Sequence, residues 1–227
     1  MSTENDTMHT LSLNPVIVAE STSSAEPEYT QLKSRMRYTR WFIIGLAPLI
    51  VVSGSQWPEN SLAHEVMEWG GHILVVVGVM IRVFASLYVG GRKNNELITD
   101  GPFSIVRNPL YVGSFFAMVG LGLLTGSLLI TLLLVLAFVF CYALTVPREE
   151  LYLSRKFGER YARYMQRVPR WLPDLSLWQN PREMNVKPYF VLRTMVDGAG
   201  FFLAVPVLEA ICTLRQQGVL PTYLTLL

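Results

Sequence analysis

Two long apolar runs follow one another almost without a connection, and this constrains the fold more than any other feature. The first covers residues 109 to about 124 and the second covers 127 to about 146, so that only Thr125 and Gly126 separate them. Because a bilayer offers no water to unpaired backbone groups, each run must satisfy its own hydrogen bonds as a helix. The sequence therefore predicts a helical hairpin whose outer ends lie on one side of a membrane.

Three further apolar runs cover residues 41–52, about 70–88 and about 189–214. The first of these is short for a span of roughly 20 residues unless Met36 and Tyr38 are included. Of the 227 residues, 51% are hydrophobic and 16% are charged, which favours a membrane protein over a soluble one. We predict an all-α, multi-pass membrane helical bundle with about five transmembrane helices.

The first 30 residues have a different composition, rich in Ser, Thr, Glu and Asn. They lack the basic start and apolar core of a signal peptide, and they are too polar to build a core. We predict a disordered polar tail over 1–30 and a single membrane domain over 31–227.

The lysines and arginines near the spans predict the orientation, since cytoplasmic loops collect them. The 53–69 loop has none and carries three glutamates. Five spans with a cytoplasmic N-terminus place every lysine- and arginine-rich loop on the cytoplasmic side. Segments 89–110 and 147–188 then meet on that face. The basic residues of the three flanks are Lys33, Arg35, Arg37, Arg40, Arg92, Lys93, Arg107, Arg148, Arg155, Lys156, Arg160, Arg163, Arg167, Arg170, Arg182 and Lys187.

Several function classes receive no support from the sequence. A net charge of +2 does not indicate nucleic-acid binding. Cys141 and Cys212 lie in apolar runs without a CxxC neighbour, and His9, His64 and His72 form no ligand cluster, so we expect neither a disulfide scaffold nor a metal site. No G-x-G-x-x-G follows a strand, so a Rossmann domain is not indicated.

The segment that introduces the hairpin, GPFSIVRNPLYVG, combines a helix start with a positive charge. Asn108 before Pro109 is typical of a helix N-cap, and we expect its side chain to accept from the amide of Leu110 or Tyr111. Exposed amides beside Arg107 would form an anion site at the membrane surface. The alternative is a well-capped span whose arginine extends to the headgroups.

A second polar segment, from 146 to 173, follows the hairpin. Phe157, Tyr161, Tyr164 and Val168 recur at helical spacing and predict an amphipathic cytoplasmic helix. Before them, Glu149 and Glu150 follow the end of the fourth apolar run, at the edge of the hydrocarbon region of the membrane. A carboxylate at this place loses part of its hydration. These acids either belong to a site or mark a solvated helix end.

The two segments together resemble the isoprenylcysteine carboxyl methyltransferase and phospholipid methyltransferase superfamily of membrane enzymes. The family signature is R-H-P-x-Y-x-G, then a hairpin, E-E, F-G-x-x-Y and R-V-P. The resemblance covers about residues 85–173, and Asn108 departs from it by replacing the family's histidine with a side chain that cannot titrate near neutral pH. The matching residues are Arg107, Asn108, Pro109, Tyr111, Gly113, Glu149, Glu150, Phe157, Gly158, Tyr161, Arg167, Val168 and Pro169.

The resemblance implies a membrane methyltransferase that uses S-adenosylmethionine and a lipophilic acceptor that enters from the bilayer. It implies that elements at 89–111 and 147–173 bind the cofactor on the cytoplasmic side. Arg107 and Glu150 match the catalytic arginine and glutamate of the family: Arg107 would hold the acceptor, and Glu150 would orient Arg107 or balance the cofactor's charge. The implied cofactor-binding residues are Leu97, Ile98, Gly101, Pro102, Asn108, Tyr111, Glu149, Glu150 and Arg167.

Two other functions fit parts of the pattern. A membrane reductase of the sterol-reductase type would bind NADPH, but such chains are usually much longer and paired glutamates suit a sulfonium better than a phosphate. A non-catalytic membrane protein would use the loops as a partner-binding platform. Arg82, inside the second apolar run, either faces the protein interior with a partner or lies near the cytoplasmic end and extends to the surface, and we take the second as the default.

Overall fold

The computed structural model describes residues 48, 50, 53–55, 57–58, 61–90, 96–181, 188–220 and 224–226. All of them belong to the unit formed by residues 44–227. The predicted tail and most of the first apolar run lie outside the described residues. Within this part the all-α architecture is confirmed, apart from two three-residue strands, β1 (Ser53–Ser55) and β2 (Leu224–Leu226), which pair in parallel.

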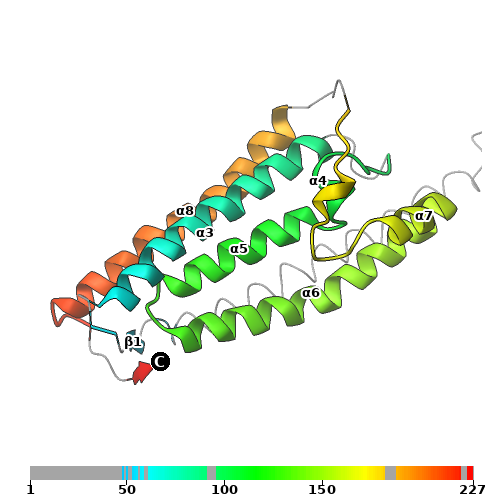
Figure 1. Cartoon of the computed structure of the whole chain (residues 1–227). Helices are drawn as coiled ribbons and strands as arrows, with labels where there is room; N and C mark the ends of the chain where they lie inside the picture. Colours follow the sequence, from blue (N-terminus) through cyan, green and yellow to red (C-terminus); the bar gives the residue numbers. More distant parts are fainter. Residues whose placement is uncertain are drawn as a thin grey trace, which may run out of the picture. The chain divides into compact units, whose positions relative to one another are not determined.

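Four long helices form the bundle (Figure 1). They are α3 (Leu62–Val89), α5 (Pro109–Leu123), α6 (Leu128–Phe157) and α8 (Pro188–Gln216). Helix α3 packs along both α5 and α8, and α6 packs against α5. The short elements α4 (Pro102–Ile105), α7 (Glu159–Arg167) and η1 (Leu175–Leu177) lie together at the end where α5 begins and α6 ends (Figure 1).

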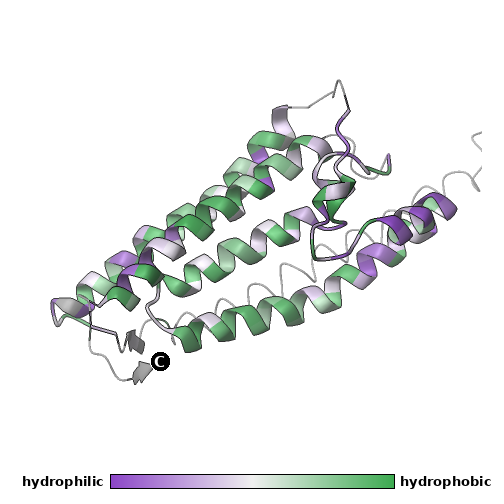
Figure 2. Ribbon diagram, viewed as in Figure 1, coloured by the Kyte–Doolittle hydropathy of each residue, from purple (hydrophilic) through white to green (hydrophobic). Residues whose placement is uncertain are grey.

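Three described helices are long and apolar enough to cross a membrane, over Leu62–Val89, Leu128–Phe157 and Val191–Arg215. Helix α5 has 15 residues, which is about 22 Å and less than the roughly 30 Å of hydrocarbon that a span must cross. Figure 2 shows hydrophobic colour along α3, α5 and most of α6, with hydrophilic colour gathered on α7 and its flanks. The protein is an integral membrane protein, and the number of five spans stays a prediction.

The predicted hairpin between α5 and α6 is confirmed. Leu123 accepts from the Gly126 amide at 2.9 Å, and Gly126 takes a positive φ of 69° that closes the turn. Ser127 then caps α6, its hydroxyl accepting from the Ile130 amide at 3.3 Å. The turn thus satisfies backbone groups that would otherwise be unpaired at two adjacent helix ends.

The helix that contains the fourth apolar run is longer than that run. The amphipathic stripe, meaning Phe157, Tyr161, Tyr164 and Val168, does not lie on one helix. Helix α6 does not end near Val146 but continues through Pro147 to Phe157, and it breaks at Gly158, where φ is +55°. The stripe therefore bends between two helices, because only glycine adopts this backbone conformation readily. Tyr161, Tyr164 and Val168 still form a buried cluster, with Leu97, Leu153, Phe157 and Met165 packed against it.

Hydrogen bonds to backbone carbonyls join the two polar segments, as expected for segments predicted to lie on one face of the membrane. The Gly101 amide donates to Gln179 at 2.7 Å and the Asp174 amide donates to Ile105 at 2.9 Å. The Tyr164 hydroxyl donates to the carbonyl of Phe103 at 2.8 Å. The segment before α5 is thereby fixed by residues that follow it by more than 60 positions in the sequence.

Gly101 is expected to tolerate no side chain. Its φ of 56° and ψ of −129° favour glycine, and an added Cβ would lie 2.2 Å from the Tyr88 ring. Gly158 has nearly the same backbone angles, 55° and −129°, with nothing within 4 Å of an added Cβ. We predict that Gly101→Ala lowers the midpoint of thermal unfolding by much more than Gly158→Ala does. The difference between the two midpoints measures the effect of the contact between the added Cβ and the Tyr88 ring. Equal midpoints would contradict this arrangement.

Candidate active site

The backbone of Arg107 is bound to a segment that lies far from it in the sequence. Its amide donates to the carbonyl of Pro169 at 2.8 Å, and the next residue, Asn108, is at the N-cap position of α5. The Arg107 side chain is 13% exposed. A short turn between two helices thus carries a guanidinium into the protein at the polar end of the bundle.

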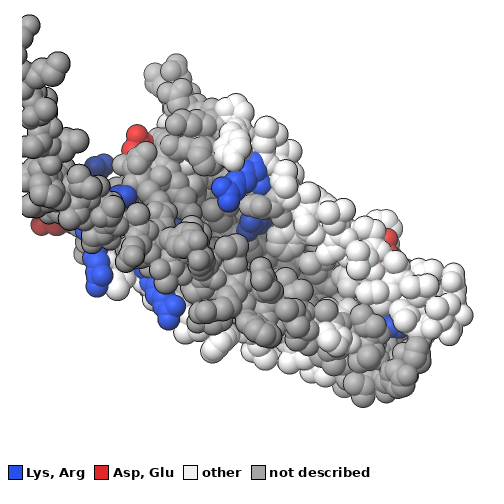
Figure 3. Space-filling model, turned by 180° about the vertical axis from the view of Figure 1, so that it is seen from behind, with Lys and Arg blue, Asp and Glu red and all other residues white. Residues whose placement is uncertain are grey.

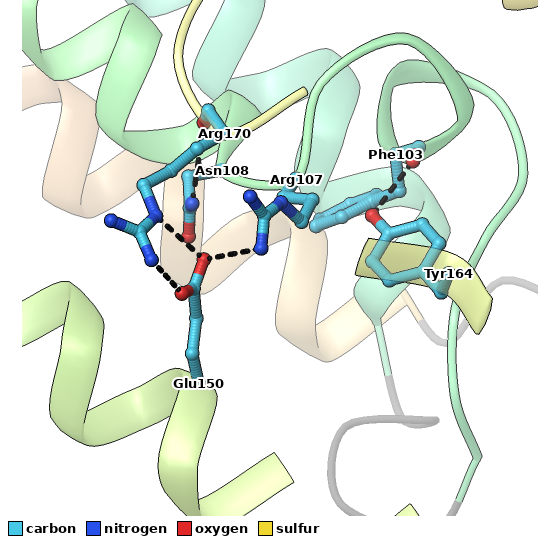
Figure 4. A network of polar contacts seen from close by, with 6 residues as sticks. All are labelled: Phe103, Arg107, Asn108, Glu150, Tyr164 and Arg170. Atoms are coloured by element: carbon cyan, nitrogen blue, oxygen red, sulfur yellow. Dashed lines mark hydrogen bonds and ion pairs between the residues drawn. The ribbon is translucent and has the colours of Figure 1, made fainter. Parts of the chain in front are cut away.

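Glu150 lies between two arginines (Figure 4). Its Oε1 is 3.0 Å from Nη1 of Arg107, and its two oxygens accept from Nε and Nη2 of Arg170 at 3.1 and 2.5 Å. The Glu150 side chain is 8% exposed, whereas that of Arg170 is 43% exposed. Two guanidiniums share one carboxylate, so this group of three carries a net charge of +1 when all are ionised.

Two buried tyrosines line the other side of Arg107. Burial first, and then the Glu150 carboxylate, raises the pKa of Tyr161 to about 12, although Arg107 hydrogen-bonds to it and lowers the value. Burial also raises the pKa of Tyr164. Both phenols are therefore neutral at physiological pH, and Glu150 rather than a phenolate balances Arg107. The hydrogen bond to Glu150 raises the pKa of Arg170 and keeps that guanidinium charged.

Asn108 stands at the N-cap position of α5, but its side chain does not cap the helix. Its Nδ2 donates to the carbonyl of Arg170 at 3.4 Å, while its own backbone carbonyl accepts from the amides of Tyr111 and Val112 at 3.0 and 3.1 Å. The predicted side-chain cap is therefore wrong. The close Arg107–Pro169 backbone contact brings the 169–170 segment near enough to compete for the amide.

The second glutamate has a different environment. The Tyr111 hydroxyl donates to Oε2 of Glu149 at 2.7 Å, and the Tyr111 ring lies 4.4 Å from that of Tyr142. Tyr111 is 7% exposed and Glu149 is half-buried. Adjacent positions of α6 thus hold one carboxylate between two arginines and one beside a tyrosine.

The remaining predicted residues lie around this centre in different ways. Leu97 packs against the cluster of Tyr161, Tyr164 and Val168, and Ile98 is half-buried. Gly101 and Pro102 are buried at the start of α4. Arg167 is exposed, and the later arginine that reaches Glu150 is Arg170.

Sequence reasoning missed Arg170 and gave Tyr161 only a packing role. Arg170 directly follows the R-V-P motif, so its position beside matched residues was the available signal. Tyr161 was visible as a motif residue, but no spacing rule shows that it contacts Arg107. Both depend on how the 168–180 segment folds back over α4.

Positive charge gathers at this end of the described surface (Figure 3). Exposed arginines and a lysine continue from the end of α6 through α7. They are Arg155, Lys156, Arg160, Arg163 and Arg167. Among the described residues, no group of three or more His, Cys, Asp or Glu side chains is arranged to hold a metal ion.

Comparisons with known proteins show which family the chain resembles. A family model described as phospholipid methyltransferase matches residues 67–160, which contain Arg107 and Glu150. The protein-S-isoprenylcysteine O-methyltransferase of Schizosaccharomyces pombe is 37% identical over 81 residues, 36% of this chain and 34% of that protein. The corresponding Xenopus laevis enzyme is 34% identical over 116 residues, 47% of this chain and 40% of that protein.

Similarity over most of the chain is found to a protein named for metal resistance. The nickel-cobalt-cadmium resistance protein NccN of Alcaligenes xylosoxydans xylosoxydans is 32% identical over 220 residues, covering 95% of this chain and 99% of that protein. No solved structure gives a significant match. The chain belongs to the isoprenylcysteine carboxyl methyltransferase and phospholipid methyltransferase family, and it is a membrane methyltransferase.

Proposed function

We propose that this protein transfers a methyl group from S-adenosylmethionine to a carboxylate on a lipophilic acceptor at the cytoplasmic face of the membrane. The observation that carries the proposal is the shared ion pair, in which Arg107 and Arg170 flank one buried Glu150. This arrangement leaves excess positive charge at the polar end of a membrane bundle. An anionic acceptor, or the carboxylate of the cofactor's own amino-acid part, suits such a centre.

The residues near this centre fit the cofactor's charges. The Nε of Arg107 is buried without a hydrogen-bond partner, so it is available to an anion. Glu149 offers a half-buried carboxylate for a sulfonium or an ammonium group. We propose that Arg107, Glu149, Tyr111 and Asn108 hold the amino-acid end, and that Leu97, Ile98, Gly101 and Pro102 lie near the nucleoside, with Arg167 contributing positive charge at the surface.

The bound cofactor would supply a methyl group on a positively charged sulfur. Transfer of this methyl group to a carboxylate would form a carbon–oxygen bond as the carbon–sulfur bond breaks, and would convert an anion and a cation into a neutral ester and a neutral thioether. Loss of opposite charges proceeds more readily where water is scarce. The burial of Arg107 and Glu150 at the end of membrane helices provides such a place.

Arg107 and Glu150 have separate roles in this proposal. Arg107 orients the acceptor carboxylate, and positioning of this kind accounts for much of the rate in a reaction that needs no proton transfer. Glu150 fixes Arg107 from one side, so that the remaining N–H groups point in a defined direction. No general base is needed for a carboxylate, which agrees with an asparagine at position 108.

Calorimetric titration with S-adenosylhomocysteine and with NADPH tests the cofactor. We expect the purified protein to bind the first and not the second. Binding of NADPH alone would instead support a reductase, and binding of neither would support a non-catalytic platform. Mass spectrometry of lipid extracts incubated with the protein and isotopically labelled S-adenosylmethionine then identifies the acceptor, and a label that hydroxide releases as methanol indicates a methyl ester.

A further inference from the structure

Arg82 lies inside the bundle, which corrects the default prediction that it extends to the membrane surface. Its Nη1 donates to the hydroxyl of Ser114 on α5, and its guanidinium carbon lies 5.8 Å from the centre of the Phe201 ring on α8. Three helices therefore meet around one positive charge. Arg82 is seven residues before the end of α3 at Val89, which places it about 10 Å inside that end.

The direction of the side chain follows from the helix itself. The Cα–Cβ bonds of a helix tilt toward its N-terminus, and on α3 this direction leads away from the polar end. The stem of Arg82 also packs closely on Gly113, where an added Cβ would lie 2.9 Å from Cγ of Arg82. The absence of a side chain at Gly113 lets the guanidinium reach Ser114, one residue further along α5.

The charge of Arg82 has no anionic partner in the described part of the chain. Its contacts there are a hydroxyl and an aromatic face, and its Nε is buried without a hydrogen bond. An arginine inside membrane helices usually pairs with a carboxylate, because a desolvated charge is costly. Arg107 at the polar end has such a partner in Glu150. Arg82 is thus prepared for an anion that the described side chains do not supply.

We propose that Arg82 binds the anionic group of the lipophilic acceptor as it enters from the bilayer. Ser114 positions the guanidinium, since its oxygen accepts from Nη1 of Arg82 while its hydroxyl donates to the carbonyl of Leu110 at 2.9 Å. Ser114 is six residues after Asn108 on α5, about 9 Å along the helix axis. The anion would therefore bind first at Arg82, on the membrane side of the Arg107 and Glu150 centre. Phe201 covers one face of the guanidinium and offers an apolar contact to the lipid part.

This inference rests on the proposed function, but it assigns the two arginines different effects. A residue that binds the acceptor equally in the ground and transition states changes KM, whereas a residue that acts in the transition state changes kcat. Arg82 is accordingly a specificity-determining residue. Its loss should weaken the binding of anionic acceptors without affecting the cofactor.

The test uses the full-length protein in detergent with two probes, N-acetyl-S-farnesylcysteine and the neutral amide of that compound. Their Kd values are measured by competition or thermophoresis, independently of turnover, and S-adenosylhomocysteine is titrated separately. We expect Arg82→Gln to raise the Kd of the carboxylate probe by about tenfold or more, because a hydrogen bond to a charged group is lost. The amide and S-adenosylhomocysteine should bind as before, and Arg82→Lys should restore part of the loss.

Arg193→Gln is the matched control, since Arg193 is an exposed arginine on α8, and it should leave the Kd of both probes unchanged. The proposal is overturned if Arg82→Gln binds the carboxylate like the wild type, or if it loses both probes and S-adenosylhomocysteine together, which would indicate a structural role. It is also overturned if the wild type does not prefer the carboxylate to the amide. Failure of the proposed function has a different signature, namely no binding of S-adenosylhomocysteine, and the Kd ratio of the two probes still decides the role of Arg82.

Discussion

Replacing Arg107 with alanine is expected to abolish methyl transfer while leaving the protein folded in detergent. The guanidinium would be lost from the place where the acceptor carboxylate is oriented, and removal of one such charge-directed donor lowers kcat by about 10²- to 10³-fold. The fold should survive because Glu150 keeps its two hydrogen bonds to Arg170. Transfer of label from S-adenosylmethionine and the midpoint of thermal unfolding measure the two effects separately.

Glu150→Ala should behave differently. It leaves two neighbouring guanidiniums without their carboxylate, and breaking a buried pair by removing one partner costs about 3–5 kcal/mol. The exposed side of Arg170 remains solvated, so the lower part of that range applies. We expect Glu150→Ala to lose both activity and stability, whereas Arg107→Ala loses activity alone.

Arg163→Ala is the control for the first variant, because Arg163 is an exposed arginine on α7. It should retain the wild-type rate and unfolding midpoint. A wild-type rate in Arg107→Ala would remove Arg107 from the catalytic centre. An unfolded Arg107→Ala would show that Arg170 alone cannot balance Glu150, and Arg107→Lys, which keeps the charge, would then separate charge from geometry.

The elements that the sequence predicted well depend on local rules. The hairpin needed only two apolar runs and a two-residue connection, Thr125 and Gly126, which lie in the turn between α5 and α6. The proximity of Arg107 and Glu150 followed from motif matches on either side of that hairpin. Local pattern and a shared membrane face were sufficient in both cases.

The features that the sequence did not predict depend on contacts between distant segments. The Asn108 side chain was assigned to a helix cap, but the 169–170 segment offers it a different partner. Arg170 reaches Glu150 only because the chain folds back over α4. The apolar run predicted a helix only to about Val146, whereas α6 continues into the polar residues, which favour helix, and breaks at Gly158.

The second large effect concerns the packing of α3 on α5, where adding one methyl group should destabilise the protein. An added Cβ at Gly78 would lie 2.5 Å from the backbone oxygen of Gly113 and 2.5 Å from the backbone nitrogen of Ala117. The same close approach recurs at Gly120, whose Cβ would lie 2.6 Å from the oxygen of Gly71. Small residues of this kind let membrane helices come into direct backbone contact.

The control for Gly78→Ala lies on the same helix. An added Cβ at Gly70 would meet only Cδ1 of Leu123, at 4.0 Å. Both substitutions gain the helix propensity of alanine over glycine, about 1 kcal/mol. We therefore expect Gly70→Ala to be neutral or stabilising. Gly78→Ala should lower the free energy of unfolding by about 1–3 kcal/mol, the usual cost of overpacking, since backbone atoms cannot move aside as a side chain can.

Denaturant-induced unfolding in detergent micelles, followed by circular dichroism, compares the two variants. The double variant Gly78→Ala/Ala117→Gly removes the contact with Cβ of Ala117, which an added Cβ at Gly78 would approach to 2.8 Å, but leaves both backbone contacts. It should therefore recover only part of the loss. If Gly78→Ala is as stable as Gly70→Ala, α3 and α5 are not in direct backbone contact. Arg82 packs its side-chain stem on Gly113 in the same α3–α5 contact. Without the close approach of the two helices, its guanidinium would not reach Ser114.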